Sequence, residues 1–209
     1  MPAKKQFRKR RYPKKGNAKL AQRVKRLESL TGKPEFKVVD SVGSTAVSTT
    51  ATLTLLNGLA EGDSATTRDG RQVLFKSLQL YERGTLHASA TNTTIRSIIF
   101  LDKQPNETAP TAAALLATAV AGGVDAFRNL DNRKRFVILH DSRMVLSTDF
   151  PERVHEHYKK MSLVSQYDSG NAGTIADITS NSLYLLQISD EATNTPTQIF
   201  NVRLRFIDN

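Results

Sequence analysis

Apolar and polar residues alternate along most of the chain beyond residue 35. In the last such segment, Gln198–Ile207, large apolar residues fall on one face, while Arg203 and Arg205 fall on the other. A period of two residues is typical of a β-strand with one buried face. The same reasoning predicts strands at Phe36–Val42, Ala46–Leu56, Gln72–His87, Thr94–Leu101, Lys134–His140, Arg143–Ser147, Tyr158–Tyr167 and Ser182–Ser189.

The segments between these strands indicate how the strands are connected. Glu61–Arg71 and Asp168–Thr179 are long for hairpin turns, which favours Greek-key crossovers. One interior helix is predicted at Thr111–Ala121, a run rich in Ala and Leu. Strands and helices do not alternate, so a parallel sheet is not expected. The pattern predicts an all-β fold, with one antiparallel two-sheet sandwich formed by residues 34–209.

A helical period appears near the N-terminus, where the spacing predicts a short amphipathic helix at about residues 18–31. Asn17 is a suitable N-cap residue, and Gly32 is a suitable stop. A helix of this length is marginal by itself in water, so its apolar stripe needs a partner. Two partners are open: the rest of the chain, or a helix of another subunit. The stripe consists of Leu20, Val24, Leu27 and Thr31.

Positive charge is concentrated in residues 1–33. Thirteen of these residues are Lys or Arg and one is Glu, so the segment carries +12, whereas the whole chain carries +10 with 30 basic and 20 acidic residues. Subtraction leaves 17 basic and 19 acidic residues for 34–209, a net charge of −2. The chain is therefore predicted to consist of a cationic arm, residues 1–33, and a nearly neutral body.

A cationic arm of this density favours binding to a polyanion, because each neutralised phosphate releases counterions. Phe7 and Tyr12 lie among the cations and could stack on unpaired bases. The same composition also suits a nuclear localisation signal, so the host import machinery is a second predicted partner. The arm lacks the apolar face of a membrane-surface helix. The predicted nucleic-acid-binding residues of the arm are Lys4, Lys5, Arg8, Lys9, Arg10, Arg11, Lys14, Lys15, Lys19, Arg23 and Arg26.

Composition excludes several classes of protein. The chain has no cysteine, which rules out a disulfide framework and a thiolate zinc site. The N-terminus has charge but no apolar stretch behind it, so no signal peptide is expected. The uncharged stretch 108–124 is too short and too interrupted to span a bilayer. The chain is expected to be soluble and intracellular when it is synthesised.

No catalytic constellation is visible in the sequence. His140, Asp141 and Ser142 are consecutive, but neighbours in a strand point to opposite faces and cannot form a relay. Glycine-rich phosphate loops and the common hydrolase and zinc-protease motifs are absent. The chain is predicted not to be an enzyme and to need no cofactor.

Two groups of residues were considered as metal ligands. His155 and His157 share a face if their segment is a strand, but no third ligand is evident, so surface histidines are the preferred interpretation. Glu61, Asp63 and Asp69 lie in one loop without the regular oxygen-ligand spacing of a calcium loop. No metal site is predicted.

The order of several local phrases resembles the capsid proteins of small circular single-stranded DNA viruses, the circovirus-like and related viruses. A Lys/Arg arm that leads into a short amphipathic helix is also similar to the coat proteins of satellite RNA viruses. The phrases that carry the first resemblance are Lys76–Leu80 with Arg83–Leu86, Ser97–Asn106, His140–Ser147, Asn181–Leu186 and Val202–Phe206.

The resemblance implies a jelly roll of eight strands and a T=1 shell of about sixty copies, with the arm inside. It also implies that Arg203 and Arg205 lie on the sheet that faces the packaged nucleic acid, unless they pair with acidic residues at a subunit contact. The predicted function is that of a viral capsid protein, found in the virion and, during assembly, in the host nucleus. Circular single-stranded DNA is the favoured cargo. The alternative is a cellular nucleic-acid-binding protein of the ribosomal or chromatin type.

Overall fold

The computed structural model describes residues 15–30, 35–117 and 123–208. The chain divides into two units at Glu35, two residues beyond the predicted end of the arm. The first unit contains helix α1 (Lys15–Leu30), and all strands belong to the second. None of the described helices is long and apolar enough to cross a membrane.

Helix α1 begins earlier than the sequence predicted. It includes Asn17, which is therefore not its N-cap, and Gly32 lies outside the described residues. The reason is that Lys, Ala, Gln, Leu and Arg dominate the segment and all favour helix, so one unfavourable Gly16 in the first turn does not prevent an earlier start. The predicted apolar stripe is present, and Leu20 and Leu27 remain 62% and 61% exposed.

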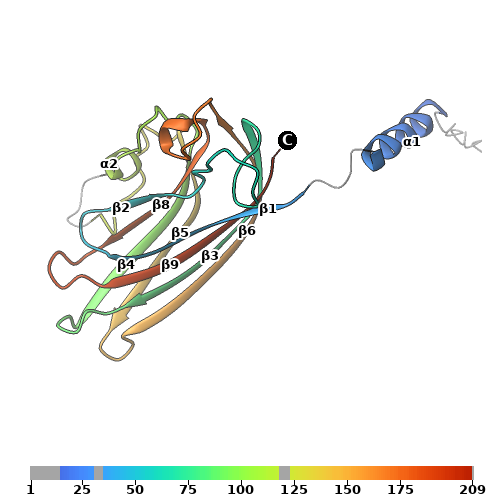
Figure 1. Cartoon of the computed structure of the whole chain (residues 1–209). Helices are drawn as coiled ribbons and strands as arrows, with labels where there is room; N and C mark the ends of the chain where they lie inside the picture. Colours follow the sequence, from blue (N-terminus) through green and yellow to red (C-terminus); the bar gives the residue numbers. More distant parts are fainter. Residues whose placement is uncertain (1–14, 31–34, 118–122, 209) are drawn as a thin grey trace, which may run out of the picture. The chain divides into compact units, whose positions relative to one another are not determined.

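Nine strands form two antiparallel sheets within the described residues (Figure 1). One sheet has the order β1-β9-β3-β6-β7, and the other has the order β2-β8-β4-β5. The strands are β1 (Lys37–Ala46), β2 (Thr52–Leu55), β3 (Gln72–Thr85), β4 (Asn92–Asp102), β5 (Phe136–Ser147), β6 (Glu152–Tyr167), β7 (Ile178–Ser180), β8 (Ser182–Ser189) and β9 (Thr197–Asp208).

The strand order is that of a jelly roll. The chain changes sheet between β1 and β2, between β2 and β3, between β3 and β4, between β5 and β6, between β7 and β8, and between β8 and β9. Two four-stranded antiparallel sheets linked by such crossovers are the double Greek key of a jelly roll. The predicted fold class is confirmed. Strand β7, which has three residues, is an addition to the eight strands of a jelly roll. It pairs only with the end of β6 and follows a short 3-10 helix, η1 (Ile175–Asp177).

Three strand predictions were wrong, the first two because polar residues within strands resembled stops. Phe136–Ser147 is one strand, although Asp141 interrupts the apolar pattern, because Arg96 of β4 donates two hydrogen bonds to the Asp141 carboxylate. Strand β6 begins at Glu152, six residues before the prediction, since Glu152–His157 pair with the second half of β3. The predicted strand Ala46–Leu56 is divided, and β1 ends at Ala46.

The interior helix is much shorter than the sequence predicted. Helix α2 spans Ala112–Leu115, with Thr111 as a side-chain cap. At Leu116 the backbone becomes extended, and Ala117 then donates a backbone hydrogen bond to the carbonyl of Phe127. Pairing with a distant segment thus ends the helix that local propensity favoured. The remainder of the predicted helix, residues 118–121, lies outside the described residues.

The core leaves one sheet face open to the surroundings. Phe75, Leu80, Leu185 and Phe206 pack between the sheets. A second cluster, which includes residues of α2, covers the outer face of the β2-β8-β4-β5 sheet, so that every residue of β8 is buried. In the other sheet, β3, β6 and β9 alternate between buried or half-buried positions and exposed ones. The outer face of β1-β9-β3-β6 is therefore available for contacts.

Candidate nucleic-acid interface

Three of the predicted cationic residues lie in a row on helix α1. Lys19, Arg23 and Arg26 follow one another at spacings of four and three residues, which places them on one side of the helix. All three are exposed, and together with Gln22 they line a shallow hollow. The row lies beside the apolar stripe of Leu20, Val24 and Leu27, so α1 presents an apolar face and an adjacent cationic face.

The densest part of the cationic arm lies outside the described residues. Lys15 is the first residue of α1. The residues concerned are Lys4, Lys5, Arg8, Lys9, Arg10, Arg11 and Lys14.

Arg203 lies on the open sheet face and is neutralised within its own chain. It sits opposite Asp40 of β1, and its Nε and Nη2 atoms each donate a 2.7 Å hydrogen bond to the Asp40 carboxylate. The hydrogen bonds from Arg203 lower the pKa of Asp40, against a smaller opposing effect of burial. The sequence suggested either a contact with nucleic acid or an ion pair between subunits. It did not indicate this pair within one chain, because Asp40 is 163 residues away from Arg203.

Arg205 lies on the same face in a different environment. Its guanidinium carbon sits 3.9 Å from the centroid of the Phe36 ring, which is a cation–π contact. Among the described residues, no carboxylate forms an ion pair with it, so its charge is not neutralised as that of Arg203 is. Arg205 is therefore the better placed of the two to attract a phosphate.

Other side chains on this face were missed in the sequence. The strand register places Gln79 of β3 beside Arg203 and opposite Tyr158 of β6. Tyr81 lies next to Asn201, and a hollow of about 160 Å³ is lined by Gln79, Tyr81, Asn201 and Arg203. Exposed aromatic rings and amides suit contacts with unpaired bases. In the sequence, these residues could be recognised only as the polar positions of the alternating pattern in β3. The register between strands shows which residues lie beside them.

This face is not uniformly basic. Arg83 pairs with Glu152 at 3.2 Å, and Glu156 is also exposed on the sheet. Isolated surface pairs of this kind contribute little net attraction. The positive charge of the chain consequently remains concentrated in residues 1–33 rather than on the sandwich.

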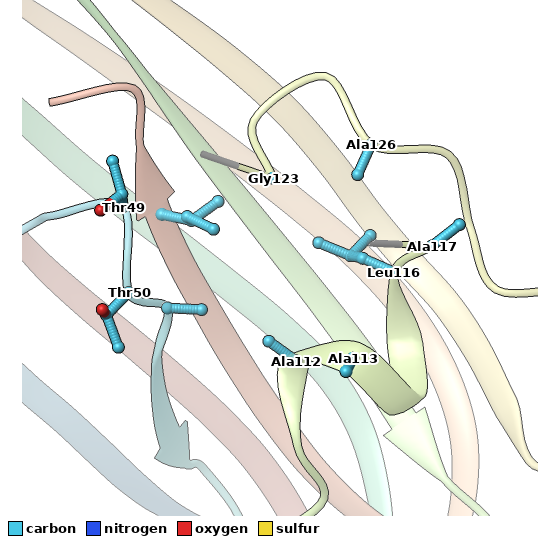
Figure 2. A pocket seen from close by; sticks show the side chains of 10 residues that line it. Thr49, Thr50, Ala112, Ala113, Leu116, Ala117, Gly123 and Ala126 are labelled. Carbon is cyan, nitrogen blue, oxygen red and sulfur yellow. The ribbon is translucent and has the colours of Figure 1, made fainter. Parts of the chain in front are cut away.

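A separate hollow of about 340 Å³ lies between α2, the segment before β2 and the end of β8 (Figure 2). Its lining is mostly Ala, Leu and Ile, with Thr49 and Thr50 at one side. No charged side chain lines it among the described residues, so it does not extend the candidate nucleic-acid interface.

Two of the three acidic residues considered as calcium ligands pair with cations instead. Glu61 lies 3.4 Å from Arg68, and Asp69 lies 2.9 Å from Lys37. The described residues contain no group of three acidic, His or Cys side chains arranged to hold a metal ion.

The histidines considered as metal ligands do acquire a third histidine. His155 and His157 share the inner face of β6, as predicted, and His140 of β5 lies against both. The rings stack in nearly parallel planes, at interplanar angles of 17° and 20°. Tetrahedral coordination requires nitrogen lone pairs that converge on one point. The lone pairs lie in the ring planes, so those of stacked rings do not converge in this way. Asp141 points to the other face and binds Arg96, so the three consecutive residues His140, Asp141 and Ser142 form no relay.

Comparison with known families identifies this chain. The sequence model for the "Satellite tobacco necrosis virus coat protein" family matches residues 3–209. The chain belongs to this family. It is also 26% identical over 176 residues to the coat protein of Maize white line mosaic Satellite virus, covering 78% of this chain and 76% of that protein. The coat protein is therefore a virion component with a structural role.

Two solved virus structures give weaker likenesses. The empty head of Turnip Yellow Mosaic Virus matches with a TM-score of 0.36 and 14% identity over 85% of this chain and 82% of that chain. Broad Bean Stain Virus matches with a TM-score of 0.32 and 15% identity over 85% and 87% of the two chains. These TM-scores are too low to establish a common fold, so the jelly-roll assignment rests on the strand order.

The family match distinguishes between the two viral resemblances inferred from the sequence. It supports a satellite virus coat protein and gives no support to the circovirus-like resemblance, which had been preferred. The phrases behind that preference all come from strands and adjoining loops, whose composition many jelly rolls share, whereas the arm followed by an amphipathic helix was the more specific feature. The cellular alternative, a ribosomal or chromatin component, is set aside by the viral family.

Proposed function

We propose that this coat protein assembles with its own copies into a T=1 shell of about sixty subunits and packages single-stranded nucleic acid with its cationic arm. The observation that carries the proposal is the separation of charge: +12 in residues 1–33 and −2 in the remaining 176 residues. A nearly neutral body allows copies to pack side by side, while the arm supplies the attraction to phosphate.

The size of this charge couples assembly to packaging. About sixty arms of +12 present about 720 positive charges to one cavity, enough to neutralise on the order of a thousand phosphates, since part of the charge of a polynucleotide is already screened by counterions. An empty shell would retain the mutual repulsion of its arms. The cargo therefore contributes directly to the stability of the particle.

Helix α1 and the open sheet face add contacts beyond the arm. Lys19, Arg23 and Arg26 extend the cationic surface along α1, and Arg205 supplies a charge on β9 that no carboxylate neutralises among the described residues. Arg203 can bind a phosphate only in competition with Asp40, so its contribution is smaller. The arm residues dominate affinity because they are more numerous.

The cargo we propose is single-stranded RNA rather than the circular DNA that was favoured from sequence. The support is the resemblance of the arm and helix to satellite RNA virus coat proteins, the one consistent with the family match. Nuclear import was predicted only from the composition of the arm, which nucleic-acid binding already explains. Digestion of nucleic acid extracted from particles with ribonuclease or deoxyribonuclease identifies the cargo, and DNA would contradict this assignment.

Deletion of residues 2–15 tests the packaging mechanism. We expect particles of the truncated protein to be absent or empty, because the deletion removes eight of the thirteen cations in the arm. The measurements are sedimentation and the ratio of absorbance at 260 and 280 nm. A matched control replaces the deleted segment with an uncharged one of equal length, which separates charge from length. Full-length cargo in particles of the truncated protein would overturn the proposal.

A further inference from the structure

Strands β5 and β6 lie at one side of the sandwich, and each is an edge strand over most of its length. Strand β5 ends the order of its sheet, and β7 pairs only with Gln166 and Tyr167 of β6, so residues 152–165 of β6 also form an edge (Figure 1). Within the described part of the chain, backbone groups along both edges have no second neighbouring strand. The contact between β5 and β6 therefore depends on side chains that reach from one sheet to the other.

Three histidines make that contact. The His140 ring lies 4.0 Å from the His157 ring and 5.0 Å from the His155 ring, measured between centroids. Lys159 adds a hydrogen bond of 2.8 Å from its Nζ atom to the carbonyl oxygen of Leu139. We call His140, His155 and His157 the histidine stack.

The stack holds ring nitrogens away from solvent without hydrogen-bond partners. Nε2 of His140, Nδ1 of His155 and Nε2 of His157 are buried and accept or donate no hydrogen bond among the described residues. Burial, with smaller contributions from His157 and His155, lowers the pKa of His140 to about 4. Burial also lowers the pKa of His157, with smaller effects from Lys159 and His155. The closed stack therefore favours the neutral form of His140 and of His157.

Charged groups on every neighbouring strand bear on the stack. Lys159 of β6 opposes protonation, and Arg153 of β6 and Arg143 of β5 line the hollow next to His155. Asp141 of β5 favours protonation of His140, but its carboxylate is held by Arg96 of β4 on the opposite face. Glu82 of β3 is the remaining group.

Glu82 is almost fully buried and lies 3.6 Å from Nδ1 of His155. Its Oε1 atom accepts a hydrogen bond from Gln198, and burial raises the pKa of Glu82 to about 7. At mildly acidic pH this carboxyl group is therefore mostly protonated, and it supplies little negative charge to compensate a protonated histidine.

We propose that the histidine stack is a pH-sensitive contact between the two sheets, and that mild acidification opens the β5–β6 side of the sandwich. Protonation places positive charges on rings 4.0–5.0 Å apart and next to Lys159, and Glu82, the carboxyl group beside His155, is itself mostly neutral at that pH. Separation of β5 from β6 relieves this repulsion by exposing the rings to water. The rest of the jelly roll, where apolar residues fill the interior, is retained.

The direction of the pH effect follows from proton binding. His140 and His157 take up protons on opening at pH values below about 6.5, and for His140 this uptake continues down to about pH 4. Each proton taken up raises the equilibrium constant for separation of β5 from β6 by up to about tenfold for each unit by which the pH falls. Glu82 acts oppositely between about pH 4.5 and 7, because it releases a proton on opening. Below about pH 6.5, two histidines against one carboxyl group favour opening as the pH falls, by at most about tenfold per pH unit.

Hydrogen exchange measured by mass spectrometry on the purified full-length particle tests this proposal. Exchange times are scaled for the intrinsic rate at about pH 7.5 and about pH 5, and protection in β5 and β6 is compared with protection in the β1–β9 pair. We expect the relative protection of β5 and β6 to fall at the lower pH, by up to about tenfold. An unchanged ratio would overturn the proposal.

Matched variants separate the stack from other acidic effects. His140→Phe combined with His157→Phe keeps flat rings but removes the titrating groups, and the acid-induced fall should disappear; His140→Gln serves if the double variant does not fold. His87→Phe changes an exposed histidine outside the stack and should behave as the unmodified protein. Glu82→Gln should enlarge the fall. An acid-induced fall in protection as large in both stack variants as in the unmodified protein would contradict the proposal. Hydrogen exchange reports on the β5–β6 contact itself and does not depend on which cargo is packaged.

Discussion

Arg68 illustrates how a single buried side chain can hold two loops together. It is fully buried, and its guanidinium donates hydrogen bonds to the carbonyl oxygens of Leu59, Gly70 and Gly170. The same group lies 4.7 Å from the centroid of the Tyr167 ring. A buried cation is stable only with such partners. The sequence gives no sign of this role, because the acceptors are backbone atoms up to 102 residues away.

Arg68→Leu should lower the free energy of unfolding by about 3 kcal/mol, because three buried carbonyl groups lose their donor and the ring contact is lost. Urea denaturation followed by circular dichroism measures the change. The control is Arg71→Leu, at an exposed position in the same loop, which should change stability by less than about 0.5 kcal/mol. Equal effects of the two substitutions would refute the assigned role.

Arg203 and Arg205 provide a matched pair on one strand. Arg205→Gln should lower nucleic-acid affinity and reduce the slope of log affinity against log salt by about one, because one phosphate contact is lost. Arg203→Gln should leave that slope nearly unchanged, since Asp40 already occupies the guanidinium. Its effect on stability should be below about 1 kcal/mol, because the ion pair is exposed. Fluorescence anisotropy with a short oligonucleotide gives both slopes, and a larger effect of Arg203→Gln would contradict this ranking.

At the scale of elements, periodicity located most strands but not their ends. The central parts of β3, β4, β8 and β9 were predicted because one face of each is consistently apolar. The first six residues of β6 were missed because their inward positions are occupied by polar side chains, among them His155 and His157. Helix α2 was predicted too long because a backbone pairing that is distant in sequence ends it at Leu115.

Helix α1 offers a prediction at the same scale. Changing Lys19, Arg23 and Arg26 together to Gln should reduce the salt slope of nucleic-acid binding by about two to three, because the three residues form one cationic row. Helicity should be unaffected, since Gln favours helix about as well as Lys and Arg. Lys25→Gln, which lies off this row, is the control and should change the slope by less than one. Equal slopes for the triple variant and the unmodified protein would exclude the row from binding.

At the scale of the whole molecule, the two units divide the tasks of a coat protein. The sandwich is held by apolar residues between its sheets and carries almost no net charge, so copies of it can approach one another. In the proposed function, the arm supplies the attraction to nucleic acid, because it carries a charge of +12. The open β1-β9-β3-β6 face and the β5–β6 side differ in kind: the first is polar on its outside, while the second has titratable groups on its inside.

The amino-acid sequence by itself determined the charge separation, the β-rich body, the Greek-key connectivity and the amphipathic character of α1. Charge separation, strand content and amphipathicity follow from composition and from short-range periodicity, which any stretch of chain expresses locally, and the Greek-key connections follow from the lengths of the segments between strands. Only the tertiary structure decided that Asp40 neutralises Arg203, that Arg68 bridges two loops and that His140 meets His155 and His157. Each of these contacts joins residues far apart in the chain, and sheet order and register bring them within a few ångströms of each other.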